Sequence, residues 1–355
     1  MEHITRGLVR TNLPRLPPAL GFEGDQEYLQ QVELWRRWIK WEREDPLVLK
    51  DEDIHAYQQR VLYTYKQAAM ALRYWPEIWV EAAEWCFANG IEKDGTDQGV
   101  EFLAQGIAAN PESCLLAFKH ADRLESVLPV EENDDGLARR GTAIREPYDR
   151  LHSALYDLIK KVKARETREL AKIEESASLD ATISAVIQKA EEDDEDAVRI
   201  DQEAKYIAKA KQLKAVQEGY AMQLHLLSRT ISLSWIALMR AMRRVQGKGA
   251  KGPGGKPVSG SRLIFADARA RGRITSDVYV ASALIEHNVY KDPAGTKIFE
   301  KGAKLFPEDE VFILEYLKHL LSIGDTTSEY FPETVKLYQL LDFTIQVGPG
   351  MWMHP

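Results

Sequence analysis

The sequence predicts an all-α fold, an α-solenoid of antiparallel helix pairs. A repeated proline motif, a repeated aromatic pattern and a spacing that fits one repeat unit support this prediction. The dipeptide Pro-Glu ends a helix-like stretch at Pro76, Pro111 and Pro307, and the first two prolines are 35 residues apart. Helical-hairpin repeats have a unit length of about 34 residues. Arrays of this kind serve mainly as surfaces for partners rather than as active sites.

A small residue precedes each of these prolines by five positions, namely Ala71, Gly106 and Gly302. Proline lacks an amide hydrogen and clashes with the preceding turn, so it ends one helix and can occupy the first turn of the next. A small residue lets a neighbouring backbone come close. Each unit is therefore predicted to be a helix, a proline-marked turn and a second helix.

Large apolar residues recur at positions i, i+3 and i+6 of the predicted helices, in several cases with an acid at i+7. The fullest example is Trp35, Trp38 and Trp41 followed by Glu42. Positions i and i+7 fall on one line of a helix, so the acid is predicted to lie on the buried stripe. The other members are Tyr279, Ser282, Ile285 and Glu286; Leu115, Phe118, Ala121 and Asp122; Trp79, Ala82 and Trp85, with Cys86 in the acid's place; and Trp235, Leu238 and Ala241.

A buried carboxylate requires a partner, and neighbouring predicted helices offer arginines. Arg60 begins the stretch 60–63, and Arg262 begins the similar stretch 262–265, which ends in Phe265. A third version at 296–300 contains Phe299 but no arginine. An arginine fork can hold a carboxylate by two hydrogen bonds. We therefore expect Glu42 and Glu286 to bond to such arginines or to an indole N–H.

Taken in order, these motifs resemble the half-a-TPR (HAT) repeat proteins. Within that class the chain resembles the HAT-repeat subunit of the cleavage stimulation factor and its fungal counterpart in cleavage factor IA, of the suppressor-of-forked family. The resemblance covers roughly residues 8 to 328. It rests on residues 13–18, 24–27, 35–41, 44–47, 60–63, 75–79, 81–85, 278–286, 297–302 and 315–317.

The resemblance implies a nuclear scaffold, with the cytoplasm as a second location, and no enzymatic activity or cofactor. In that family this subdomain forms a homodimer interface. The implied partners are a second copy of the chain and other cleavage and polyadenylation factor subunits, with an indirect or weak contact to RNA. The residues assigned to the structural repeat signature are Trp35, Trp38, Trp41, Glu42, Arg60, Pro76, Trp79, Trp85, Pro111, Trp235, Arg262, Phe265, Tyr279, Glu286, Phe299 and Pro307.

The sequence departs from the family pattern at both ends. The family has further HAT repeats before this region, and after residues 325–328 it resumes with an Arg-x-aromatic-Glu helix where this chain reads Glu329-Tyr330-Phe331-Pro332-Glu333. A truncated product, a divergent copy or a faulty gene model would each explain both differences. The family's C-terminal tail holds its RNA-binding partner subunit, so partners that depend on this tail are not carried over to this chain.

The predicted domain organisation follows from these motifs and from composition. Residues 1–27 form an extended segment, 28–165 a first HAT block, 219–328 a second HAT block with a flexible glycine-rich loop at 247–260, and 329–355 a divergent tail. Residues 166–218 are rich in Ala, Glu and Lys and contain no proline, which favours one or two long exposed helices. A disordered segment is the alternative for this stretch.

Composition indicates an interaction protein without broad affinity for nucleic acid. The formal net charge is −8, whereas phosphate-binding surfaces are basic. Two basic clusters, Lys160, Lys161, Lys163 and Arg165, and Arg269, Arg271 and Arg273, are interpreted as solvated helix faces, with nuclear import or RNA contact as alternatives. No apolar run approaches the roughly 18 residues of a membrane span, so no membrane partner is expected.

Searches for catalytic or metal-binding patterns find none that is complete. The eight histidines are scattered, with no pair at i, i+4 beside an acid and no Cys-x-x-Cys motif. The glycine-rich loop lacks the first glycine and the hydroxyl residue of a P-loop, where Ala250 and Pro257 stand. Cys86 and Cys114 fit core positions as reduced thiols, and Ser113 fits a helix cap.

Three classes of function remain to be compared. The favoured one is a HAT scaffold that pairs with itself and organises the machinery that cleaves and polyadenylates pre-mRNA 3′ ends. The second is a HAT scaffold of the spliceosome or of ribosome assembly. The third, a hydrolase or nuclease built on the array, has no residue constellation to support it.

Overall fold

The computed structural model describes residues 5–15, 25–131, 133–188 and 195–324, and almost every regular element in these ranges is a helix. The all-α prediction is confirmed. The chain divides into two compact units, Met1–Ala154 and Leu155–Pro355, which are described separately. The predicted tail at 329–355 lies outside the described residues.

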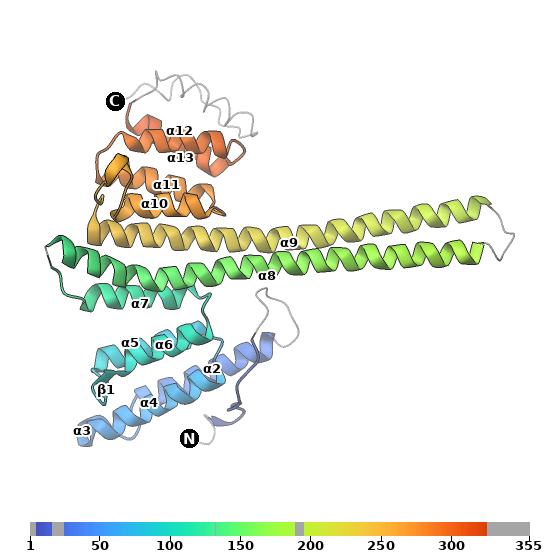
Figure 1. Cartoon of the computed structure of the whole chain (residues 1–355). Helices are drawn as coiled ribbons and strands as arrows, with labels where there is room; N and C mark the ends of the chain where they lie inside the picture. The colour runs from blue at the N-terminus through green and yellow to red at the C-terminus, as the bar shows by residue number, and fades with distance from the viewer. Residues whose placement is uncertain (1–4, 16–24, 132, 189–194, 325–355) are drawn as a thin grey trace, which may run out of the picture. The chain divides into compact units, whose positions relative to one another are not determined.

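The first unit consists of helices paired with their neighbours in sequence (Figure 1). A two-residue antiparallel ribbon, in which Glu92 pairs with Asp97, joins two of these helices. The elements are α2 (Asp25–Arg43), α3 (Leu49–Glu52), α4 (Ile54–Ala71), α5 (Pro76–Asn89), β1 (Glu92–Lys93), β2 (Thr96–Asp97), α6 (Gln98–Ala109), α7 (Cys114–Val127) and the first part of α8 (Asp134–Gln188).

The second unit combines a long helical hairpin with a short stack of helices (Figure 1). The hairpin consists of the rest of α8 and the antiparallel α9, and it contains the described parts of residues 166–218, which are helical. Helices α10 and α11 pack on α9, and α12 and α13 follow. The elements are α9 (Glu195–Gln246), the 3-10 turn η1 (Pro253–Gly255), α10 (Gly260–Arg271), α11 (Ser276–Leu284), the π-helix η2 (Ile285–Val289), α12 (Ala294–Leu305) and α13 (Glu310–Ser322).

The proline motifs occupy turns between paired helices. Pro76 is the first residue of α5, whereas Pro111 and Pro307 lie a few residues before α7 and α13. The helices after the latter two turns begin with side-chain caps instead: Ser113 Oγ accepts from the N–H of Leu116 at 3.4 Å, and Asp309 Oδ1 accepts from the N–H of Phe312 at 3.1 Å. These caps satisfy amides that have no partner within the helix.

The small residue before each proline sits where two helices cross closely. A Cβ on Gly106 would lie 2.9 Å from Cβ of Trp79, and one on Gly302 would overlap the ring of Phe312. Ala71 is buried. The role predicted for these residues, close approach of a neighbouring helix, therefore agrees with the structure.

Aromatic side chains form the core of each unit. In the first unit Trp35 has no exposed surface and stacks on Trp38 with ring centroids 5.4 Å apart. In the second unit Trp235 is buried, and Phe299 stacks on Tyr316 at 5.4 Å. Burial of large rings removes much apolar area from water and is the main stabilising term of such packing.

One part of the aromatic pattern was placed wrongly. Asp122 is exposed rather than buried, and α7 buries Leu116, Ala117 and Ala121. The buried positions Ala117 and Ala121 are four residues apart along α7, and Leu116 is buried beside them. The i, i+3, i+6 register from Leu115 starts at an exposed residue and ends at the buried Ala121, and Asp122, the next residue around the helix, lies off the buried face.

Candidate functional site: buried clamps and a docking groove

Glu42 is the centre of a buried hydrogen-bonded cluster that joins α2 to α4. Its carboxylate accepts from Arg60 Nε at 3.1 Å and from Arg60 Nη2 at 3.0 Å. It also accepts from the indole N–H of Trp38 at 3.1 Å. The predicted arginine partner and the predicted indole partner are both present. Because Glu42 is only 5% exposed, these donors replace the water that its carboxylate would contact at the surface.

Glu286 forms the corresponding cluster in the second unit. Arg262 of α10 donates to it from Nε at 2.7 Å and from Nη2 at 2.6 Å, as predicted. Arg262 also donates to Asp292 at 2.8 Å, and Lys248 bonds the same carboxylate at 3.0 Å. The backbone N–H of Ala294, followed by these two cations, holds the pKa of Asp292 well below its usual range.

The π-helix η2 carries Glu286, and its extra residue per turn was not foreseen from the sequence. Single π-turns inside helices often mark positions where a side chain must be re-aimed. Here the turn follows α11 directly and leaves Glu286 buried against Arg262. The sequence pattern alone identifies the acid but gives no sign of the local change in helix type.

The helix pair without an arginine has a neutral polar pair instead. Thr296 Oγ1 lies 2.9 Å from Nε2 of His319, which is buried at the end of α13. His319 follows Phe312 by seven residues, the same offset that separates Glu286 from Tyr279. Burial, followed by the neighbouring His287, lowers the pKa of His319. Sequence reasoning missed this pair, although the i+7 register contained the signal.

The remaining residues of the proposed repeat signature occupy packing positions. Trp41 is half-buried and Pro76 is half-buried, whereas Pro111 and Pro307 are exposed. The aromatic members are buried: Trp79, Trp85, Trp235, Phe265, Tyr279 and Phe299. The structure therefore brings Glu42 to Arg60 and Glu286 to Arg262, while the other members contribute rings and turns. Their status as a repeat signature remains a proposal.

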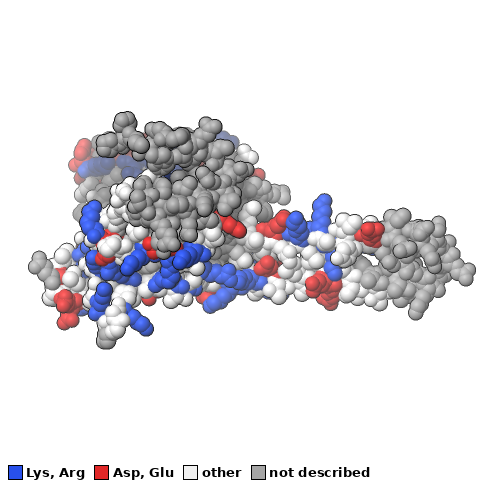
Figure 2. All heavy atoms as spheres, turned by 90° about the horizontal axis from the view of Figure 1, so that it is seen from above, with Lys and Arg blue, Asp and Glu red and all other residues white. Residues whose placement is uncertain are grey.

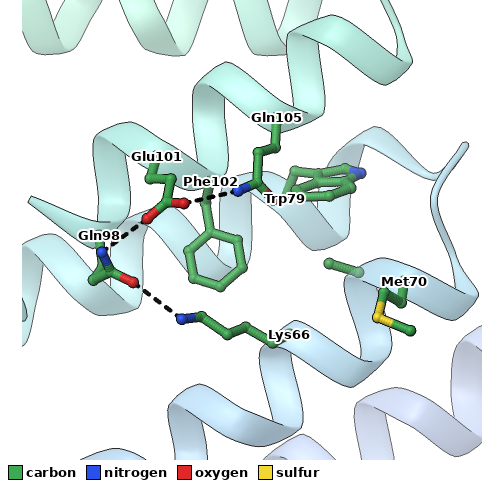
Figure 3. Close-up of a pocket in the computed structure, with 8 residues that line it drawn as sticks. Lys66, Met70, Trp79, Gln98, Glu101, Phe102 and Gln105 are labelled. Carbon is green, nitrogen blue, oxygen red and sulfur yellow. Dashed lines mark hydrogen bonds between the residues drawn. The ribbon is translucent and has the colours of Figure 1, made fainter. Parts of the chain in front are cut away.

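A groove opens on the first unit between α4, α5 and α6 (Figure 3). Its volume is about 250 Å³, and its apolar lining comes from Ala69, Met70, Trp79 and Phe102. A chain of hydrogen bonds runs along one edge, from Lys66 Nζ to Gln98 at 3.1 Å, from Gln98 to Glu101 at 2.8 Å, and from Gln105 to Glu101 at 2.9 Å. The groove is thus an apolar hollow with a fixed polar rim.

The groove chemistry suits docking of a side chain rather than a reaction. Both carboxylate oxygens of Glu101 accept hydrogen bonds from glutamine side chains of α6, so Glu101 is bonded to other residues of the groove's polar rim. Apolar hollows with a few placed polar groups are typical of binding sites. The exposed side chains of Tyr63 and Met70 on α4 each lie about one turn from Lys66.

The two cysteines are free thiols and poor nucleophiles. Burial raises the pKa of Cys86 to about 12 and that of Cys114 to about 11. The thiolate is the reactive form, so both groups are protonated at neutral pH. Within the described residues no group of three His, Cys, Asp or Glu side chains is placed to hold a metal ion. The described helices also include none long and apolar enough to cross a membrane.

Comparison with known proteins decides the family. The model for the Suppressor of forked protein (Suf) matches residues 1–334. The chain belongs to the suppressor of forked family. The resemblance predicted from the ordered motifs is confirmed, and the helical pairs described above are this family's helical repeats.

Curated fungal relatives carry the name mRNA 3′-end-processing protein rna14. The Aspergillus oryzae protein is 58% identical over 325 residues, which is 92% of this chain and 29% of the relative. The Neurospora crassa protein is 55% identical over 337 residues, 92% of this chain and 28% of the relative. The Yarrowia lipolytica protein is 28% identical over 340 residues, which is 95% of this chain and 32% of the relative. This suppressor of forked chain thus spans about three tenths of the length of these relatives.

Proposed function

We propose that this chain is a non-catalytic scaffold of the nuclear machinery that cleaves and polyadenylates pre-mRNA 3′ ends, and that it pairs with itself. The observation that carries the proposal is the similarity to mRNA 3′-end-processing proteins along 92% of the chain. The family match over residues 1–334 contains the segments that carry the buried clamps and the groove.

The described geometry suits a scaffold because it fixes surfaces rather than reactive groups. The clamp at Glu42 joins α2 to α4, and the clamp at Glu286 joins α10 to η2. Buried, fully bonded ion pairs of this kind favour one arrangement of the elements they join. The groove over Trp79 and Phe102 then offers a preformed hollow for an apolar side chain of a partner subunit.

Self-pairing is supported by an exposed apolar stripe on α9. Met222, Leu226 and Leu233 are all more than half exposed. Their spacings of four and seven residues place them on one face of the helix. Exposed apolar side chains on one face of a surface helix are a common feature of interfaces between chains, and the exposed Arg229 lies on this face between Leu226 and Leu233. We therefore assign the contact between two copies to this stripe.

Co-expression of tagged and untagged copies tests the pairing. We expect the tagged wild-type chain to retain the untagged chain, and the double variant Leu226→Asp/Leu233→Asp to lose it because two charges would be buried at the contact. Val130→Asp in the first unit introduces a charge at another exposed apolar residue and should leave pairing intact. Equal retention by all three proteins would refute the assignment of this stripe.

Affinity purification from fungal extract tests the place of the chain in the cell. We expect polyadenylation and cleavage factors to co-purify with it, and a surface variant at Met70 in the groove to lose a subset of them. Recovery of splicing or ribosome-assembly factors without any cleavage factor would contradict the proposal.

A further inference from the structure

Two basic clusters that are far apart in sequence meet in the second unit. Tyr156 of α8 donates its hydroxyl hydrogen bond to the carbonyl of Gly272 at 2.7 Å. The guanidinium of Arg271 lies over the ring of the same tyrosine, 5.0 Å from its centroid. The loop between α10 and α11 is therefore attached to the face of α8 that continues, one and two turns later, with Lys160 and Lys163.

The loop that carries the arginines is held in a defined and unusual backbone conformation. Gly272 has φ 72°, and the next residue, Arg273, has φ 59°. A positive φ is uncommon for a residue with a side chain and persists where the surroundings enforce it. Here the N–H of Thr275 donates to Ser232 Oγ of α9 at 2.8 Å, so the loop is attached to both helices of the hairpin.

The resulting basic surface is defined by Lys160, Lys163, Arg271 and Arg273. Lys163 is half-buried and the other three are exposed. Arg271, Arg273 and Lys163 form no ion pair within the described part of the chain, and Lys160 bonds to Asp157 at 2.9 Å. The nearest acid after the loop, Asp277, accepts from Thr275 Oγ1 at 2.8 Å. Figure 2 shows Lys and Arg side chains gathered beside the base of the hairpin.

We propose that this basic surface binds the phosphate backbone of single-stranded RNA. The arrangement offers several cations on a fixed frame, although the whole chain carries a net charge of −8. The choice of RNA as the occupant rests on the proposed role in mRNA 3′-end processing.

The arginine geometry favours RNA over an acidic protein segment. The guanidinium of Arg271 lies over the ring of Tyr156, and that of the neighbouring Arg269 lies over Phe265 at 4.9 Å. Arginine guanidinium groups and aromatic rings are the side chains on which the bases of single-stranded RNA stack. An acidic peptide would pair with the charges but would not need aromatic rings beside them.

Fluorescence anisotropy with a labelled single-stranded RNA, measured on the full chain over a range of salt concentrations, tests the proposal. The double variant Arg271→Gln/Arg273→Gln should raise the Kd about tenfold and lower the slope of log Kd against log salt by about 1.4, since each phosphate contact to a single strand contributes about 0.7. The variant Lys172→Gln/Lys211→Gln makes the same change of charge at exposed positions farther along the hairpin and should leave both quantities unchanged.

Circular dichroism and the retention of an untagged copy accompany each measurement, so that loss of RNA binding can be separated from misfolding or loss of pairing. Wild-type protein that binds no RNA, or a 271/273 variant that binds like wild type, would overturn the proposal. Tighter binding of poly-glutamate than of RNA at the same ionic strength would also overturn it, because the occupant would then be an acidic protein. If copies fail to pair while RNA binding behaves as expected, the proposed scaffold function fails and this inference stands.

Discussion

The substitution Glu42→Gln tests whether the buried clamp stabilises the first unit. Glutamine keeps the size of the side chain and one acceptor, but its amide N–H₂ must face one of the three donors that Glu42 now satisfies. A hydrogen bond to a charged group contributes about 1.5–3 kcal/mol. Since Arg60 is 35% exposed, water recovers part of the loss, and we expect a decrease in the free energy of unfolding of about 2 kcal/mol.

Urea unfolding followed by tryptophan fluorescence measures this change, because Trp38 contacts the carboxylate. Glu44→Gln is the matched control: Glu44 lies two residues away, is 62% exposed and is 3.8 Å from Lys40. We expect that control to change stability by less than about 0.5 kcal/mol. A result in which Glu42→Gln costs no more than Glu44→Gln would refute the structural role of the clamp.

Three further predictions concern the second unit. Glu286→Gln should destabilise it by more than Glu42→Gln destabilises the first, because Arg262 is only 23% exposed; equal urea midpoints for wild type and variant would contradict this. Gly302→Ala should lower the free energy of unfolding by about 1–3 kcal/mol because its Cβ would overlap Phe312. Gly219→Ala, in open space on α9, should raise it by about 0.8–1 kcal/mol. If urea unfolding found Gly302→Ala more stable than Gly219→Ala, the packing described would be contradicted. Because the pKa of His319 is lowered in the folded chain, the unfolded chain binds a proton at a higher pH than the folded chain does. Stability should therefore fall as the pH drops below about 6.5. The variant His319→Gln should reduce this pH dependence of thermal unfolding.

The sequence contained enough information for the fold class and for the two arginine clamps. The prolines that end helices and the periodicity of apolar residues are signals that can be read from short stretches of sequence. An acid on the buried face of a helix has few possible partners. Arg60 and Arg262 could therefore be named in advance as the partners of Glu42 and Glu286. Local patterns of this kind predict element type better than exact helix rotation.

The features that escaped prediction depend on contacts between distant segments or on helix rotation. The buried face of α7 runs through Ala117 and Ala121 and leaves Asp122 at the surface. The groove needs Lys66 of α4 beside Gln98 of α6, and the basic surface needs Tyr156 beside Gly272. Each of these pairs is separated by many residues, so periodicity within one helix carries no information about it.

Sedimentation equilibrium of the purified chain at micromolar concentration tests the central claim, that this helical array works by pairing with itself. The account predicts a species with twice the mass of one chain that shifts to a single-chain mass in Leu226→Asp/Leu233→Asp. A wild-type protein that sediments as one chain throughout that concentration range would contradict it.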